Sequence, residues 1–212
     1  MLYKTEYSKL TFGQIQYLTG WWYQYFPQRP TISEPTSRML RNTINALHVQ
    51  RPKIVELGCH DGSWAEDFLV RNPFNVEWNG YDINPRAIED GLSRMIVGNS
   101  SIFDINLYLL STQIYEVSKP LMDADIFFSS HTLEHMDWRQ VEHLIVALYK
   151  KNVKHVIYEI PTLVSRGFYP GSNAHVLKVR ERELEDYFAS FKYELIEMCK
   201  HERGSSWRLT RV

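Results

Sequence analysis

The sequence is poor in cysteine, in net charge and in long apolar runs, and each of these shortages excludes a class of protein. Only two of the 212 residues are cysteines, Cys59 and Cys199, which is too few for a disulfide framework or a cysteine-ligated zinc site. The formal net charge of −1 removes the simplest electrostatic reason to expect a nucleic-acid-binding protein. The longest apolar run, residues 144–149, is far shorter than the ~20 residues that span a bilayer. Because the N-terminus also lacks the apolar core of a secretory signal, we expect a soluble, cytoplasmic protein that does not insert into membranes.

The beginning of the chain differs from the rest in its aromatic content. Aromatic residues crowd the stretch 3–26, and apolar residues at helical spacing follow a proline-containing break. We expect residues 1–50 to form an N-terminal helical extension that packs on a single domain made by residues 51–212. The second helix of the extension should begin at Ser33 or Glu34, since Pro35 suits a first helical turn. The aromatic side chains could instead line a pocket or form the interface of a homo-oligomer.

Strand-like and helix-like segments alternate from residue 53 onward. Apolar segments that predict strands occur at residues 53–57, 76–84, 94–99, 123–130, 153–161, 193–202 and 205–212. We expect helices at residues 64–70, 85–92, 100–118, 138–149 and 180–191, and a loop at residues 162–178. Such alternation predicts an α/β fold, a Rossmann-like three-layer sandwich. Its seven-stranded sheet should be mostly parallel, with an antiparallel hairpin at one edge and the N-terminal helices added to it.

The first expected strand and its helix are joined by a glycine-containing turn with the sequence E-L-G-C-H-D-G at residues 56–62. Gly58 and Gly62 let the backbone turn sharply and approach a ligand, and the N–H groups that begin the helix favour a polar or charged group. The turn does not have the dinucleotide pattern G-x-G-x-x-G, because His60 and Ser63 occupy the second and third glycine positions. The chain also lacks the G-K-[ST] ending of a P-loop.

An acidic residue, Asp82, ends the second expected strand. Ligands of open α/β sheets bind at the carboxyl ends of the strands, and Asp82 follows Glu56 at about the distance expected of a ribose-binding acid. A carboxylate at this place can accept hydrogen bonds from both hydroxyls of a ribose. The alternative is that Asp82 only caps the helix that begins at Pro85.

The segment H-T-L-E-H at residues 131–135 follows the fourth expected strand and has two interpretations. It formally matches an inverted zinc-protease motif, in which two histidines four residues apart on a helix bind one metal ion. That interpretation needs the motif inside a helix and a third ligand, whereas here the segment directly follows an apolar strand ending in two serines. We therefore expect no metal site.

Taken in order, these segments resemble the motifs of class I S-adenosylmethionine-dependent methyltransferases of the small-molecule type. The pattern E-x-G-x-x-x-G at residues 56–62 resembles the first motif, although His60 departs from its commonest form. G-Y-D-I-N-P at residues 80–85 resembles the second motif, and S-x-x-L-E-H at residues 130–135 resembles the segment after the fourth strand. The resemblance spans residues 53 to about 200. It implies an active methyltransferase that binds S-adenosylmethionine and releases S-adenosylhomocysteine.

The resemblance also assigns roles to individual residues. It implies cofactor contacts by residues of the strand ends and loops, namely Glu56, Gly58, Cys59, His60, Gly62, Asp82, Ile83, Asn99, Ser100, Ser130 and His131. Asn99 would contact the adenine unless it is only a turn residue, with Asp104 as a weaker substitute. His131 is the leading candidate for a catalytic base, because an unperturbed imidazole has a pKa of ~6.5. A ring that only hydrogen-bonds the backbone would fit equally well, and His175 in the 162–178 loop is a second candidate base.

The acceptor of the methyl group is not fixed by these motifs. We expect an oxygen or nitrogen atom of a small molecule, such as a sugar, a lipid precursor or a metabolite. A nucleic acid is an alternative, because basic residues recur towards the end of the chain, but acidic residues interleave with them and an N-P-P-Y-type motif is absent. A non-catalytic binding or scaffold protein that keeps the methyltransferase fold is a further alternative, which His60 and the aromatic N-terminus would support.

Overall fold

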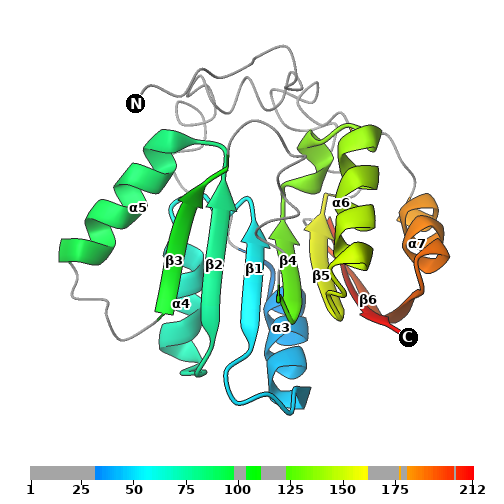
Figure 1. Ribbon diagram of the computed structural model, residues 1–212, viewed down its shortest axis with the longest axis horizontal. Coiled ribbons are helices and arrows are strands. Elements are labelled where there is room, and N and C mark those ends of the chain that lie inside the picture. The colour runs from blue at the N-terminus through cyan, green and yellow to red at the C-terminus, as the bar shows by residue number, and fades with distance from the viewer. Residues whose placement is uncertain (1–31, 98–103, 111–122, 162–176, 178–180, 203) are drawn as a thin grey trace.

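The computed structural model describes residues 32–97, 104–110, 123–161, 177, 181–202 and 204–212 (Figure 1). Within these ranges, seven strands form one sheet with helices packed on both of its faces. The strands are β1 (Lys53–Leu57), β2 (Glu77–Asp82), β3 (Asp104–Leu109), β4 (Ile126–Ser130), β5 (His155–Ile160), β6 (Tyr193–His201) and β7 (Gly204–Arg211).

The strand order is β3-β2-β1-β4-β5-β7-β6. The first five strands in this order pair in parallel, whereas β7 is antiparallel to both β5 and β6. This arrangement confirms the predicted Rossmann-like sheet with an antiparallel hairpin at one edge. The direction of strand connection reverses between β1 and β4, so the sheet has its topological switch point there, which is where open α/β sheets bind ligands.

The helices that cover the sheet are α3 (Glu34–Ala46), α4 (Ser63–Arg71), α5 (Pro85–Val97), α6 (Trp138–Lys150) and α7 (Glu181–Ser190). Figure 1 shows α6 in front of the sheet and α3 and α4 behind it. The rear face buries one apolar cluster, which includes Met39, Leu40, Ile54, Phe68, Trp78, Phe128 and Ile157. The front face buries a larger cluster beneath α6 and α7, which includes Leu144, Leu148, Tyr158, Leu184, Phe188 and Trp207. None of the helices that the structure describes is long and apolar enough to cross a membrane.

Helix α3 begins where the sequence predicts it. Ser33 is the N-cap, its hydroxyl oxygen accepts a hydrogen bond from the Thr36 backbone N–H at 3.4 Å, and a proline stands in the first turn. One side of the helix, with Met39 and Leu40, is buried against the sheet. The first predicted helix and the aromatic residues of the extension lie outside the described residues, so the boundary at residue 50 stays a prediction.

Two neighbouring elements, the third strand and the helix after it, are wrongly placed by the sequence prediction. The segment 94–99 was expected to be a strand and 100–118 a helix, but α5 continues to Val97 and β3 runs from Asp104 to Leu109. Apolar residues of α5, such as Ile88 and Met95, recur at helical spacing and pack on one cluster, so the segment 94–97 extends a helical face. Residues 104–109 instead alternate polar and apolar side chains, which is the period of a strand.

Candidate functional site

The carboxyl ends of β1, β2 and β4 bring three of the predicted segments together. Leu57 at the end of β1 pairs with Tyr81 of β2 on one side and with Ser129 of β4 on the other. The glycine-containing turn, the acidic residue after β2 and the H-T-L-E-H segment therefore all begin at the same edge of the sheet, beside the switch point. This convergence is what a ligand site of an open α/β sheet requires.

The turn after β1 is held in an unusual backbone conformation. Gly58, His60 and Gly62 all have positive φ angles, of 80°, 56° and 72°. The N–H groups of Gly58 and Cys59 both donate to the carbonyl oxygen of Tyr81, at 2.8 and 3.2 Å, and so tie the turn to β2. His60, which departs from the commonest form of the motif, thus adopts the left-handed conformation that a glycine would take most cheaply. Histidine is among the residues that tolerate this conformation better than most.

Asp82 supports the turn through both of its carboxylate oxygens. Oδ2 accepts a hydrogen bond from the His60 backbone N–H at 2.8 Å, and Oδ1 accepts one from the Asn84 backbone N–H at 2.9 Å. The side chain that caps α5 is Asn84, whose Oδ1 accepts from the N–H groups of Arg86 and Ala87. Asp82 is therefore not the helix cap. It is a buried carboxylate, only 4% exposed, that joins the end of β2 to the turn after β1.

The other residues predicted around the turn lie at its base. Glu56 is fully buried in β1, and its Oε2 accepts a hydrogen bond from the indole N–H of Trp78 at 3.0 Å. Cys59 is fully buried and packs against Gly80, where an added Cβ would lie 2.8 Å from the Cys59 Cβ. Ile83 is partly buried against the front apolar cluster. Any contact that Cys59 makes with a ligand would therefore come from its backbone.

Arg94 of α5 clamps the turn from the side. Its Nη1 lies 2.6 Å from Asp61 Oδ2, its Nη2 donates to the Asp61 carbonyl oxygen at 2.7 Å, and its Nε donates to Glu66 at 3.2 Å. Burial alone would raise the pKa of Asp61, but hydrogen bonds from His60 and Ser63 and the charge of Arg94 outweigh it and hold the pKa well below its usual range. Asp61 is therefore a fixed negative charge inside the turn.

The H-T-L-E-H segment does not lie in an α-helix. His131 follows directly on β4 with a φ of 52°, and residues Leu133–His135 form a short 3-10 helix, η3. The zinc interpretation needs its two histidines on one face of an α-helix, and that condition is not met. No group of three potential metal ligands of the kind that could hold an ion occurs among the described residues.

Thr132 makes the contact that joins this segment to the turn. A Cβ added to Gly58 would lie within 2.8 Å of the Thr132 Cβ, closer than real Cβ atoms approach one another. Only glycine at position 58 therefore leaves room for Thr132, and the loop after β4 lies directly on the turn after β1. The Thr132 hydroxyl donates to the Ser130 carbonyl oxygen at 3.1 Å, which fixes the side chain in place.

The His131 ring lies between two buried carboxylates. Its Nδ1 is 3.5 Å from Glu134 Oε1 and its Nε2 is 3.6 Å from Glu159 Oε1. Burial alone would lower the pKa of His131, but the two carboxylates outweigh it and raise the pKa to about 10. A ring protonated at neutral pH has no lone pair to accept a proton, so this environment argues against His131 as a catalytic base.

Several predicted positions lie outside this arrangement. Asp104 begins β3 opposite Glu77 at the amino end of β2, at the edge of the sheet away from the site, where it pairs with Arg51. It cannot substitute in adenine binding. Asn99, Ser100 and His175 are not among the described residues. Asn99 and Ser100 precede β3 instead of following it, so the reason for assigning them an adenine contact is wrong.

The sequence analysis missed Thr132, Glu159 and Arg94. Glu159 offered a recognisable sign, because an acidic residue inside the apolar segment V-I-Y-E-I-P is rarely buried without a partner. Arg94 was hidden by the wrong third strand, since only a helix that continues past residue 92 brings it to Asp61. Thr132 gave no sign in the sequence, because its importance comes from a contact with Gly58.

Comparison with known proteins extends what the geometry shows. Neither a scan against models of protein families nor a search among curated proteins gives a match. Among solved structures, the chain is similar to the methyltransferase domain of bacterial CtHen1-C, with 13% identity, a TM-score of 0.65, and coverage of 84% of this chain and 98% of that one. It is also similar to the magnesium protoporphyrin IX methyltransferase ChlM of Synechocystis PCC 6803 with bound SAH. That match has 11% identity, a TM-score of 0.66, and coverage of 94% of this chain and 98% of that one.

A third similar structure is that of the small RNA methyltransferase HEN1, with 17% identity and a TM-score of 0.64. The match covers 87% of this chain and 26% of that one. These similarities extend over 84–94% of this chain. The chain has the fold of class I S-adenosylmethionine-dependent methyltransferases.

Proposed function

We propose that this protein is a class I methyltransferase that transfers the methyl group of S-adenosylmethionine to an oxygen or nitrogen atom of a small-molecule acceptor. The observation that carries the proposal is the left-handed turn at residues 58–62, held against Asp82 at the switch point of a sheet with this fold. The similar ChlM structures contain SAM and SAH, which supports the same cofactor here.

The polar groups at this edge of the sheet suit that cofactor. Asp82 presents a carboxylate at the end of β2, and each carboxylate oxygen has two lone pairs, so the group can accept ribose hydroxyls besides the backbone N–H groups. The turn brings backbone close to the ligand because Gly58 and Gly62 carry no side chain. Glu56, at the base of the turn, is a further acidic group for the amino-acid end of the cofactor. Ser130 and Thr132 would line the wall formed by the loop after β4.

S-adenosylmethionine supplies an electrophilic methyl group on a sulfonium, and the protein's task is to align the acceptor with it. The acceptor atom forms the new bond to carbon as the bond from carbon to sulfur breaks, and the electron pair of that bond stays on sulfur. Alignment and exclusion of water can supply most of the rate enhancement in such a displacement. We propose that His131 contributes to positioning and not as a base, because its ring is held as a cation. His175 stays a candidate base for acceptors that lose a proton.

A nucleic-acid acceptor is the second candidate function, and the similarity to HEN1 favours it. Two of the basic residues that could support it are already engaged by other side chains. Arg208 lies 3.5 Å from Glu197, and Arg211 donates to the Asn152 side chain at 2.6 Å. Transfer of labelled methyl groups to extracted RNA, compared with transfer to a small-metabolite fraction, distinguishes the two acceptors. Tight cofactor binding with no transfer to either would favour the scaffold alternative.

The experiment that tests the proposed cofactor is calorimetric titration of the protein with S-adenosylmethionine and S-adenosylhomocysteine. We expect saturable binding of both, and we expect Asp82→Ala to weaken it by about 1–3 kcal/mol or more, which is the cost of losing charge-assisted hydrogen bonds. Asp67→Ala is the matched control, because Asp67 is an exposed residue of α4 that forms an ion pair with Arg71 across one helical turn. Equal affinity in the Asp82 variant, with its fold intact by circular dichroism, would remove Asp82 from the site.

A further inference from the structure

The feature that the proposed chemistry leaves unexplained is the charge buried around His131. Glu134 and Glu159 present side chains that are 2% and 0% exposed to the two nitrogens of one imidazole ring, whose own side chain is 19% exposed. A buried carboxylate is costly unless a counter-charge and hydrogen bonds compensate for it. The ring is placed so that one imidazolium compensates both carboxylates.

Glu159 is itself held firmly in place. Its Oε2 accepts hydrogen bonds from the hydroxyls of Thr36 at 3.0 Å and Ser130 at 3.1 Å, and from the backbone N–H of Ser33 at 3.4 Å. Its Oε1 faces His131 and also lies 3.3 Å from Nε2 of His201. Because donors from Ser33, α3 and β4 hold Oε2, the carboxylate is fixed independently of the His131 ring.

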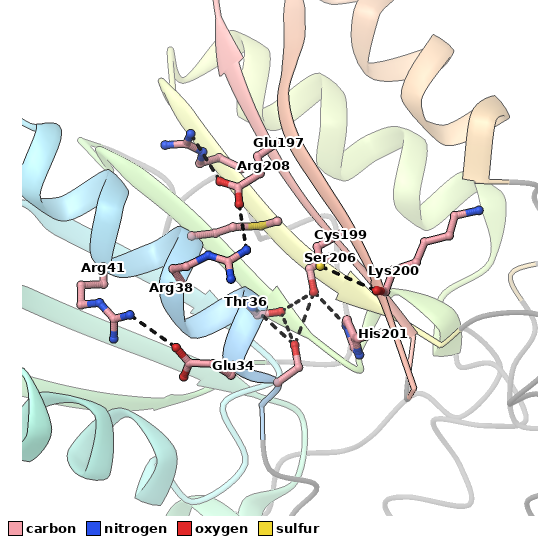
Figure 2. A network of polar contacts seen from close by, with 12 residues as sticks. Glu34, Thr36, Arg38, Arg41, Glu197, Cys199, Lys200, His201, Ser206 and Arg208 are labelled. Carbon is pink, nitrogen blue, oxygen red and sulfur yellow. Dashed lines mark hydrogen bonds and ion pairs between the residues drawn. The ribbon is translucent and has the colours of Figure 1, made fainter.

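Figure 2 shows the outer part of this network, in which Thr36, Ser206 and His201 point toward one another. The Thr36 and Ser206 hydroxyls are 2.7 Å apart, and His201 Nε2 is 2.9 Å from the Ser206 hydroxyl. Helix α3 and the β6–β7 hairpin therefore reach Glu159 through one connected set of hydrogen bonds. The network fixes the carboxylate chiefly through Oε2, the oxygen that does not face His131.

We propose that Glu134, His131 and Glu159 form a buried charge triad that positions the wall of the cofactor pocket, by fixing residues 131–134 and so holding Thr132 against Gly58. Only the link between the triad and cofactor binding rests on the proposed function; the ion pairing within the triad does not. Both ring nitrogens face carboxylates, so the triad fixes the ring orientation as well as its charge. Because Thr132 lies between His131 and Glu134 in the chain, fixing both ends of the segment fixes Thr132.

The proposal requires His131 to be an imidazolium near neutral pH, and the geometry agrees with the raised pKa of this group. Among the described residues, the titratable groups that bear on the ring are Glu134 from η3 and Glu159 from β5, with His201 from β6 beside the same Glu159 oxygen, Oε1, that faces the ring. Replacing Glu159 by glutamine keeps its size and removes its charge. Loss of the negative charge of Glu159 should lower the pKa of His131 by at least about one unit.

The first measurement is made on the unsubstituted protein and needs no cofactor. Nitrogen-15 NMR of the histidine rings at pH 8 should show both nitrogens of His131 protonated, with His131→Gln used to assign the signals. An unprotonated His131 ring nitrogen at this pH would overturn the proposed triad. This outcome is independent of whether the protein binds S-adenosylmethionine.

The second measurement links the triad to the pocket. In Glu159→Gln, the midpoint of the His131 titration should fall by at least about one pH unit, and the dissociation constant of S-adenosylhomocysteine should rise about tenfold at pH values between the two midpoints. His201→Asn is the contrasting variant, because it removes a competitor for Glu159 Oε1 and should leave the His131 titration unchanged or move it upward. Glu142→Gln controls for a general Glu→Gln effect, because it removes a charge outside the triad while the glutamine oxygen can still accept the hydrogen bond from the Tyr187 hydroxyl.

Each result decides a different part of the proposal. If Glu159→Gln shifts the His131 titration but the affinity for S-adenosylhomocysteine does not follow it, the triad is not a positioning unit for the pocket. If the unsubstituted protein binds no cofactor, the proposed function fails and the link to the pocket fails with it, while the ring measurement still decides the triad. If Glu159→Gln does not fold, Glu134→Gln tests the same midpoint from the other nitrogen of the ring.

Discussion

At the scale of single residues, Gly58 occupies the most restricted position in the site. Its φ of 80° and the contact with Thr132 leave no space for a side chain. Gly58→Ala should therefore lower the free energy of unfolding by about 2–4 kcal/mol, through left-handed backbone strain and overpacking. Urea unfolding followed by circular dichroism measures this loss.

The double variant Gly58→Ala/Thr132→Gly separates the two causes. Removing the Thr132 side chain relieves the overpacking but leaves the backbone strain, so the double variant should lose less stability than the sum of the two single variants. Strictly additive losses would show that Thr132 is not the neighbour that restricts position 58.

The sequence predicted the residues of the turn and the acid beside it, but not the partners of His131. Gly58 and Asp82 belong to local patterns, because each lies a fixed distance from the end of a strand. The neighbours of Glu159 come from α3, β4 and β6, which are far apart in the chain. No local pattern could show that these groups meet, and so the sequence suggested an unperturbed imidazole where the structure has an ion-paired one.

At the scale of secondary-structure elements, α5 acts on the site through one side chain. Arg94→Met should remove the clamp on Asp61 and loosen the turn, and so weaken S-adenosylhomocysteine binding about tenfold. Because Arg94 is about one-third exposed, solvent screening keeps the accompanying stability loss small, at about 1–2 kcal/mol. Calorimetry and urea unfolding measure the two quantities separately.

Arg71→Met is the control for this prediction. Arg71 is well exposed and forms an ion pair with Asp67 across one turn of α4, a type of pair that contributes little to stability. If both arginine variants had the same affinity for S-adenosylhomocysteine, the clamp would have no part in shaping the turn.

Most elements could be predicted because their patterns are local. Ser33 and the proline after Glu34 mark the beginning of α3, and an apolar segment followed by the H-T-L-E-H sequence marks the end of β4. The third strand could not be placed in this way, since the segment 94–97 has an apolar content that suits a helix and a strand equally well. The tertiary contacts of Met95 and Arg94 decide between them.

At the scale of the whole molecule, the buried charges predict how stability depends on pH. The pKa of His131 is raised from 6.5 to about 10 in the folded protein, so its contribution is fully present below pH 6.5 and is lost as the pH rises towards 10. The pKa of Glu159 is lowered from 4.5 to about 2: burial alone would raise it, but hydrogen bonds and the charge of His131 outweigh this. Its contribution is therefore lost as the pH falls from 4.5 towards 2.

The free energy of unfolding should therefore decline between pH 6.5 and 10, and His131→Gln should flatten this decline. Urea unfolding at several pH values measures the slope. Tyr81, Tyr187 and Tyr193, whose pKa values are raised to about 12, lose their contributions only above pH 10 and so do not cause a decline in this window. An unchanged slope in His131→Gln would mean that the ring is not an imidazolium in the folded protein.

The position of β7 between β5 and β6 has a consequence for how the protein is made. Strands β2, β3, β4 and β5 can each pair with an earlier strand as the ribosome releases them, whereas β6 emerges before the strand that will join it to the sheet. The hairpin must be synthesised through Arg211 before it can dock as one piece. Until then Glu159 lacks Ser206 and His201 beside it. The burial of this carboxylate is therefore completed only when the β6–β7 hairpin docks on β5.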